Sequence, residues 1–133
     1  MAGELTISTC RIVEWVDKFD APSNEVFGFE AVRYDTDGTV TPANGSSTTE
    51  NNIEGFAAIE SDRVGQAITV VRDGILDIGN ALSAVAIGAP LYVSDTDGQI
   101  ATSAGSNSMI IGRCVPGWGS LTADKLLLVR KGG

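Results

Sequence analysis

The order of apolar and polar residues along this 133-residue chain predicts a protein built from short β-strands. Turn residues recur about every ten positions, and apolar residues nowhere keep a 3.6-residue period over several helical turns. We therefore expect an all-β fold, a small β-barrel or sandwich-like barrel of about ten short strands with long loops and little or no helix. The predicted strands are 11–16, 26–34, 39–41, 55–59, 66–72, 75–78, 91–94, 99–102, 109–115 and 125–130.

Asp-Gly pairs mark three of the predicted turns. The sequence Asp-Thr-Asp-Gly occurs at 35–38 and again at 95–98, and Asp73-Gly74 separates two further predicted strands. Asp at the start and Gly at the end of such a segment are typical of hairpin turns. A calcium loop of the EF-hand kind needs a bidentate Glu at its twelfth position, where this chain has Ser46 and Ser106. We therefore interpret these segments as turns and expect no metal site in them.

The segments between the strands differ in character. "ANGSSTTENN" at 43–52 is polar throughout and predicts a long exposed loop. "NALSAVAIGA" at 80–89 is small and apolar, which predicts one helical turn or a packed loop that belongs to the core. Residues 1–9 are expected to form an extended N-terminal arm. A chain of 133 residues lies in the size range of one domain, so we expect a single β-domain over 1–133.

The net charge of −8 is concentrated in the first half of the chain. Residues 1–62 hold twelve acidic and three basic side chains, a net charge of −9, whereas residues 63–133 hold five acidic and six basic ones, a net charge of +1. The longest basic run is Arg130-Lys131, and nucleic-acid backbones require larger clusters of Lys and Arg, so we expect no nucleic-acid partner. The chain has no apolar stretch long enough to span a bilayer and no secretory signal pattern, so we expect no association with a membrane.

Candidate catalytic chemistry is sparse. The chain has no histidine, the usual general base and zinc ligand, and no phosphate-binding Gly-Lys-Ser/Thr sequence. Carboxylate pairs such as Asp17 and Asp20 leave an enzyme of the glycosidase kind as an alternative, although 17 acids produce such pairs by chance. Cys10 and Cys114 are expected to be reduced core thiols. We expect no enzyme activity, cofactor, metal or small-molecule substrate.

The aromatic residues divide between core and surface. Trp15 has the apolar neighbours Ile12, Val13 and Val16, which favours a core position on the first strand. Trp118 lies between glycines in "PGWGS", in a segment typical of a turn or loop, and is therefore the better candidate for a protein interface.

Phe27 and Phe29 are two residues apart within a predicted strand. Side chains at that spacing share one face of a strand, so both phenylalanines are expected to point inward.

The second half of the chain resembles the capsid decoration, or cement, proteins of tailed bacteriophages. The resemblance covers about residues 55–131 and is a pattern of turns and apolar positions. It lies in the segments "GQAITVVRDGILDI", "ALSAVAIGAPLYVSDTDGQIAT", "SMIIGRCV" and "DKLLLVRK". The shared steps fall at 74–75, 81–87, 88–93, 95–98, 111–113 and 126–129.

This resemblance implies a small β-barrel that binds the outside of an assembled capsid and stabilises it, without catalysis. The implied partner is the major capsid protein, the implied oligomer is a homotrimer, and the implied location is the exterior of the virion, after synthesis in the host cytoplasm. We expect Trp118 and the N-terminal arm, with Glu4, Leu5 and Ile7, to make the contacts. A phage tail-fibre or carbohydrate-binding β-module is the alternative.

Overall fold

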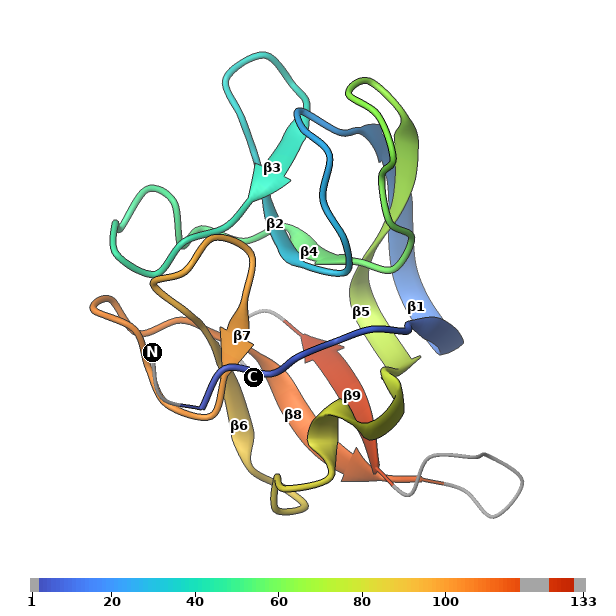
Figure 1. Cartoon of the computed structure of the whole chain (residues 1–133), viewed down its shortest axis with the longest axis vertical. Helices are drawn as coiled ribbons and strands as arrows, with labels where there is room; N and C mark the ends of the chain where they lie inside the picture. The colour runs from blue at the N-terminus through green and yellow to red at the C-terminus, as the bar shows by residue number, and fades with distance from the viewer. Residues whose placement is uncertain (1–2, 118–124, 131–133) are drawn as a thin grey trace.

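A computed structural model describes residues 3–117 and 125–130 of the chain (Figure 1). These residues form an all-β fold with one short 3-10 helix, as the alternation of short apolar runs and turn residues predicts. The elements are β1 Arg11–Pro22, β2 Ala31–Tyr34, β3 Val40–Pro42, β4 Gly55–Ala57, β5 Ala67–Asp77, η1 Gly79–Leu82, β6 Pro90–Val93, β7 Ile100–Ala101, β8 Ile110–Pro116 and β9 Lys125–Arg130.

The nine described strands form one curled antiparallel sheet, consistent with a small β-barrel. Along the sheet the order is β3-β2-β4-β5-β9-β8-β6-β7, and β1 pairs with β5 outside this path. On its other edge β5 pairs with β4 near its start and with β9 near its end. Figure 1 shows the consequence: β5 runs from the upper group of strands into the lower group, with β1 alongside it.

The prediction that Asp73-Gly74 forms a hairpin turn is wrong. Strand β5 continues through both residues because Asp73 pairs with β1 on one edge and with β9 on the other. Gly74 is required there by a close approach of chains, since a Cβ would lie 2.7 Å from the carbonyl oxygen of Glu14 and 3.0 Å from the Cα of Trp15. The glycine therefore serves strand packing, and the two predicted strands 66–72 and 75–78 are one.

Two further strand predictions need correction. Strand β1 extends to Pro22 because residues after Val16 continue to pair with the first half of β5. The predicted strand 26–34 is reduced to β2, and Phe27 instead forms an isolated bridge with Ser61. Phe27 is buried and Phe29 is half-buried, but they pack against different hydrophobic clusters. Their expected inward orientation is right, and their expected common strand face is wrong.

The core consists of two hydrophobic clusters. The larger one packs between strands β5 to β9 and reaches β2 and β4. Phe56, Leu76 and Leu127 are among its fully buried members. The smaller one lies under the upper strands and contains Val32, Val70 and their neighbours. Helix η1 confirms the helical-turn alternative predicted for 80–89, and Leu82 and Val85 join the larger cluster. The rest of the segment is only partly core, because Ser83, Ala84, Ala86 and Ile87 are exposed.

Two edges of the sheet are covered by the chain itself. Glu4 bridges to Ala101 beside β7, and Ser23 bridges to Val40 beside β3. These contacts satisfy backbone groups that would otherwise form open edges. Across 3–117 and 125–130 no helix has the length and apolar character to cross a membrane.

Candidate functional site

The sequence-predicted contact residues are not brought together on one surface. Trp118 lies outside the described residues. In the N-terminal segment the Leu5 side chain is only 8% exposed and belongs to the larger core cluster, and Ile7 packs against that cluster. The Leu5 N–H donates to the carbonyl oxygen of Ile100 at 2.9 Å. Within the expected extended arm, residues 3–5 are therefore fastened to β7 and the residue that follows it.

The Glu4 side chain contacts the turn between β6 and β7. Its carboxylate accepts a hydrogen bond from the Ser94 hydroxyl, and this bond, with a further one from Thr96, lowers the pKa of Glu4 below its ordinary value. An open pocket of about 370 Å³ lies between this segment and the region after β5. Its lining consists of Gly3, Glu4, Leu5, Thr6, Asn80, Ala81, Ala84, Val85 and Thr102.

Exposed apolar side chains gather in the first half of the chain. Of the seven large hydrophobic side chains that are exposed among the described residues, six lie between Trp15 and Val64, and only Ile87 lies beyond. The same half carries the net charge of −9. Apolar side chains supply the buried centre of many protein interfaces, and charge of one sign favours a partner of the opposite sign. We call residues 1–62, with Arg63 and Val64, the acidic half.

Trp15 and Val16 are the most prominent of these residues. Trp15 is 52% exposed and Val16 is 74% exposed, so the predicted core position of Trp15 is wrong. The ammonium group of Lys18 lies over the indole ring, 5.0 Å from its centre. A cation above an aromatic face is attracted by the ring quadrupole, and this contact orients the indole at the surface.

A second aromatic group lies further along β1. The Phe19 and Tyr34 rings stack with their centres 5.8 Å apart, and the guanidinium of Arg72 lies 4.7 Å from the centre of the Phe19 ring. Arg72 also pairs with Asp17 at 3.4 Å and with Glu54 at 3.6 Å. Two acids and an aromatic face therefore occupy this arginine, and the group fastens β1 to β5 and β2.

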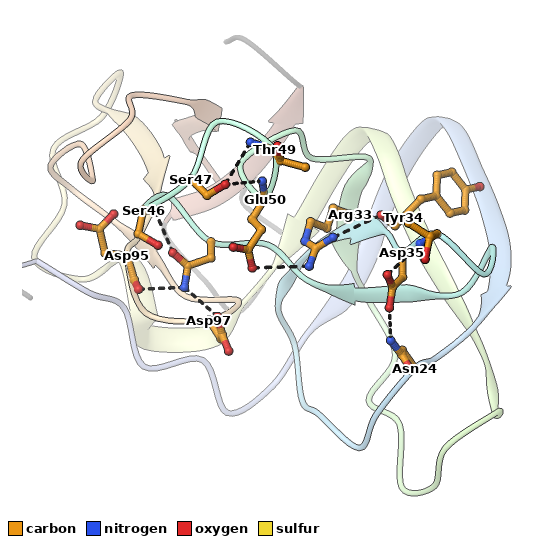
Figure 2. A network of polar contacts seen from close by, with 12 residues as sticks. Asn24, Arg33, Tyr34, Asp35, Ser46, Ser47, Thr49, Glu50, Asp95 and Asp97 are labelled. Atoms are coloured by element: carbon orange, nitrogen blue, oxygen red, sulfur yellow. Dashed lines mark hydrogen bonds and ion pairs between the residues drawn. The ribbon is translucent and has the colours of Figure 1, made fainter.

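The two Asp-Thr-Asp-Gly segments are turns, as predicted, with Gly38 at φ +85° and Gly98 at φ +73°. In the first turn Asp37 accepts hydrogen bonds from the backbone and hydroxyl of Thr39, and Asp35 accepts one from the Asn24 side chain at 2.5 Å. Figure 2 shows this turn beside the contacts of Arg33 with Glu50 and with the Tyr34 carbonyl.

The second turn joins several loops, which we call the loop junction (residues 43–46, 94–98 and 105–107). The Asp95 carboxylate accepts hydrogen bonds from the Ser106 backbone at 2.9 Å and hydroxyl at 2.6 Å. The Asn44 side-chain amide donates to Asp97 at 2.7 Å and to the Asp95 carbonyl at 2.9 Å (Figure 2). The predicted exposed loop 43–52 is thus tied down at its start, while Thr48, Thr49 and Asn52 remain exposed.

Three backbone hydrogen bonds close a ring inside the loop junction. In each bond a backbone N–H donates to a backbone carbonyl oxygen. Ala31 donates to Gly98 at 2.9 Å, Gly98 to Ala43 at 2.7 Å, and Ala43 to Ala31 at 2.8 Å. All three residues are buried. The ring connects the start of β2, the end of β3 and the turn between β6 and β7.

Glu30 lies against this ring, with its side chain packed on Gly98. Burial, with the negative charges of Glu25 and Asp97, raises the pKa of Glu30 to about 7. Most protein carboxyl groups are fully ionised at neutral pH, whereas Glu30 changes its charge there. Within the described ranges no hydrogen bond or ion pair reaches its carboxyl group.

The two cysteines also have shifted pKa values. Cys10 and Cys114 are free thiols. Burial, with the nearby Asp77 carboxylate, raises the pKa of Cys10 to about 12, and burial also raises that of Cys114. A thiol with a raised pKa is a poor nucleophile at neutral pH. Among the residues that the structure describes, no group of three or more His, Cys, Asp or Glu side chains is placed to hold a metal ion.

The chain matches no model of a known protein family and no characterised protein. The function is therefore inferred from the surface and the geometry of the chain.

Sequence reasoning missed Trp15 as a surface residue, although one signal was available. Adjacent large apolar residues on a strand point to opposite faces, so Trp15 and Val16 cannot both be buried in a sheet with one covered face.

Proposed function

We propose that this protein is a structural component of a tailed-bacteriophage virion that binds the outside of the assembled capsid and stabilises it. The observation that carries the proposal is an asymmetry between the two halves of the chain: of the seven large hydrophobic side chains exposed among the described residues, six lie in the acidic half. A surface that is both apolar and charged fits a contact with another protein. The resemblance of residues 55–131 to capsid decoration proteins supports the same assignment, and it involves no catalysis.

The proposed mechanism is stabilisation by mass action. A protein that binds the assembled lattice but not its dissociated subunits shifts the equilibrium toward the lattice. Copies at symmetric positions repeat one modest interface many times, so their contributions add over the whole shell. The partner is the major capsid protein, and the location is the exterior of the virion.

Sedimentation with undecorated shells tests this proposal. Purified protein mixed with shells is expected to leave the supernatant, and the decorated shells are expected to withstand higher temperature than bare shells. An unrelated acidic protein of similar size, which should remain in solution, provides the control. The proposal is wrong if the protein stays in the supernatant at saturating shell concentration, or if it is found only inside particles.

The proposal includes a homotrimer. Light scattering is expected to give three times the chain mass of 13.8 kDa, and chemical cross-linking on shells is expected to give trimers. Symmetric homo-oligomers suit a lattice that offers symmetric positions. Monomers both in solution and on the shell would contradict this part of the proposal and leave shell binding intact.

A carbohydrate-binding module is the second candidate, because two aromatic side chains are exposed near carboxylates. Trp15 is 52% exposed and Tyr34 is 44% exposed, and Asp17 lies on the same strand as Trp15. Aromatic faces combined with polar groups are suited to small-molecule recognition. Binding on a glycan array that is lost in Trp15→Ala, with no capture by shells, would favour this candidate.

A further inference from the structure

Strand β1 is irregular at the point where it exposes its apolar side chains. Its register with β5 shifts between Ile12 and Glu14 and again between Trp15 and Asp17, where Val13 and Val16 are extra residues on β1. A third shift, between Asp17 and Lys18, leaves Arg72 as an extra residue on β5. Such bulges bend a strand and redirect its side chains, and they are common at functional sites. Here the second bulge accompanies the exposure of both Trp15 and Val16.

The surroundings hold this stretch in position. Trp15 pairs with Gly74 across the sheet, where the glycine lets the two backbones approach closely. The Lys18 ammonium lies over the indole. An aromatic side chain that is ordered before binding loses little conformational freedom when a partner covers it.

We propose that Trp15 and Val16 are the anchor with which the protein binds the capsid surface, entering an apolar pocket of the shell protein that has a basic rim. This inference rests on the proposed function and specifies its contact face. The two residues are adjacent and are 52% and 74% exposed. Tryptophan is enriched among the side chains that dominate binding energy at protein interfaces.

The basic rim follows from charge. Residues 1–62 have a net charge of −9, and Glu14 is exposed directly beside the anchor. The nearby cations are engaged within the chain, Lys18 with the Trp15 ring and Arg72 with two carboxylates. A partner of opposite charge is attracted to such a surface at long range and oriented on approach, whereas an acidic one is repelled. The shell surface under the anchor should therefore carry Lys or Arg.

The same strand argues against a partner that adds a strand to the sheet. Two bulges, Lys18 and the terminal Pro22 are features that protect an edge from pairing with another strand. Pairing of β1 with β1 of a second copy is therefore disfavoured. The partner contacts the projecting side chains instead of the backbone edge.

Shell-binding measurements with single substitutions test the inference. Trp15→Ala is expected to weaken binding at least tenfold, and Val16→Ala a few-fold, because truncation of a central aromatic costs more than that of a small side chain. Ile87→Ala is the matched control, since Ile87 is also 52% exposed but lies in the other half, and its binding should equal wild type. Raised salt should weaken wild-type binding.

A spectroscopic measurement covers the case in which Trp15→Ala does not fold. Because Trp118 is itself an expected contact residue, the Trp118→Phe variant is first shown to bind shells as wild type does. In that background, Trp15 fluorescence is expected to shift to shorter wavelength when shells are added, with the emission of bare shells subtracted. Wild-type binding strength in the folded Trp15→Ala,Val16→Ala variant, an unshifted emission on binding, or equal losses in Ile87→Ala would each overturn the anchor and leave the proposed function standing. Failure of the wild type to bind shells would overturn both.

Discussion

The chain builds the same four-residue turn twice, once in each half, and the two copies do different work. The turn at 35–38 lies at a hairpin tip, where the Gly38 position has open space around it. The turn at 95–98 packs against Glu30 and belongs to the loop junction. Identical residues therefore determine the shape of a turn, while its neighbours determine how much stability depends on it.

The halves differ in the same way. The second half uses its turn and loops for internal contacts. Among the described residues it exposes one large hydrophobic side chain, Ile87, whereas the acidic half exposes six. We interpret the second half as the structural support and the acidic half as the contact surface. The predictions below test this division, starting with the glycines of the two turns.

Replacement of the two turn glycines is expected to give the largest difference. Both have positive φ, which costs about 1 kcal/mol for alanine. At Gly98 an added Cβ would also lie 2.8 Å from the Cβ of Glu30 and closer still to its carboxyl group. We expect Gly98→Ala to lower the free energy of unfolding by about 2 to 4 kcal/mol and Gly38→Ala by about 1 kcal/mol. Equal losses of unfolding free energy in the two variants, measured by urea unfolding, would contradict the expected difference between the turns.

Stability should depend on pH through Glu30. Its pKa is raised from 4.5 to about 7 in the folded state, so the folded protein holds this proton more tightly than the unfolded chain. The contribution of Glu30 therefore lowers the free energy of unfolding as pH rises from about 4.5 to about 7, and is constant above that.

Melting temperatures measured between pH 5 and pH 8 test this dependence. Glu30→Gln is expected to melt a few degrees above wild type at pH 8 and to equal it at pH 5. Glu60→Gln, which changes an exposed glutamate, should follow wild type throughout. A constant difference between Glu30→Gln and wild type at all pH values would exclude the titration of Glu30 as the cause.

A smaller loss of stability is expected when the carboxylates of the two turns are removed. Asp95 connects its turn to Ser106, eleven residues away, whereas the Asp37 bonds reach only Thr39. We expect Asp95→Ala to lower the melting temperature more than Asp37→Ala does, and to speed hydrogen exchange at the Ser106 amide. Unchanged exchange at Ser106 would argue against the junction.

No effect is expected from calcium. The four aspartates of the two turns are used in hydrogen bonds to backbone, hydroxyl and amide groups. Calorimetry should show no stoichiometric binding, and a chelator should leave the melting temperature unchanged. A shift of several degrees would mean that at least one turn is a metal site.

Much of the fold was predictable because its determinants are local. Turn residues and short apolar runs located most strands, and Gly38 and Gly98 adopt the conformations that hairpin turns require. Asp73-Gly74 was misread because only the tertiary pairing of β5 on both edges shows that this glycine serves a close approach. Local sequence does not contain that information.

The contact surface was harder to predict. Leu5 was expected to contact a partner. Instead its N–H donates to the Ile100 carbonyl oxygen of β7, and its side chain packs in the larger core cluster. Trp15 was expected in the core, but the bulges of β1 accompany its exposure. Both outcomes depend on contacts between residues distant in sequence.

Electron microscopy of shells incubated with the protein is the most direct measurement of the central claim. The account predicts added density on the outside of the shell, in which the acidic half faces the capsid and Trp15 of β1 lies at the contact. The strands of the second half, β6 to β9, should face away from that contact. Absence of added density, density inside the particle, or a contact made by the second half alone would contradict the account.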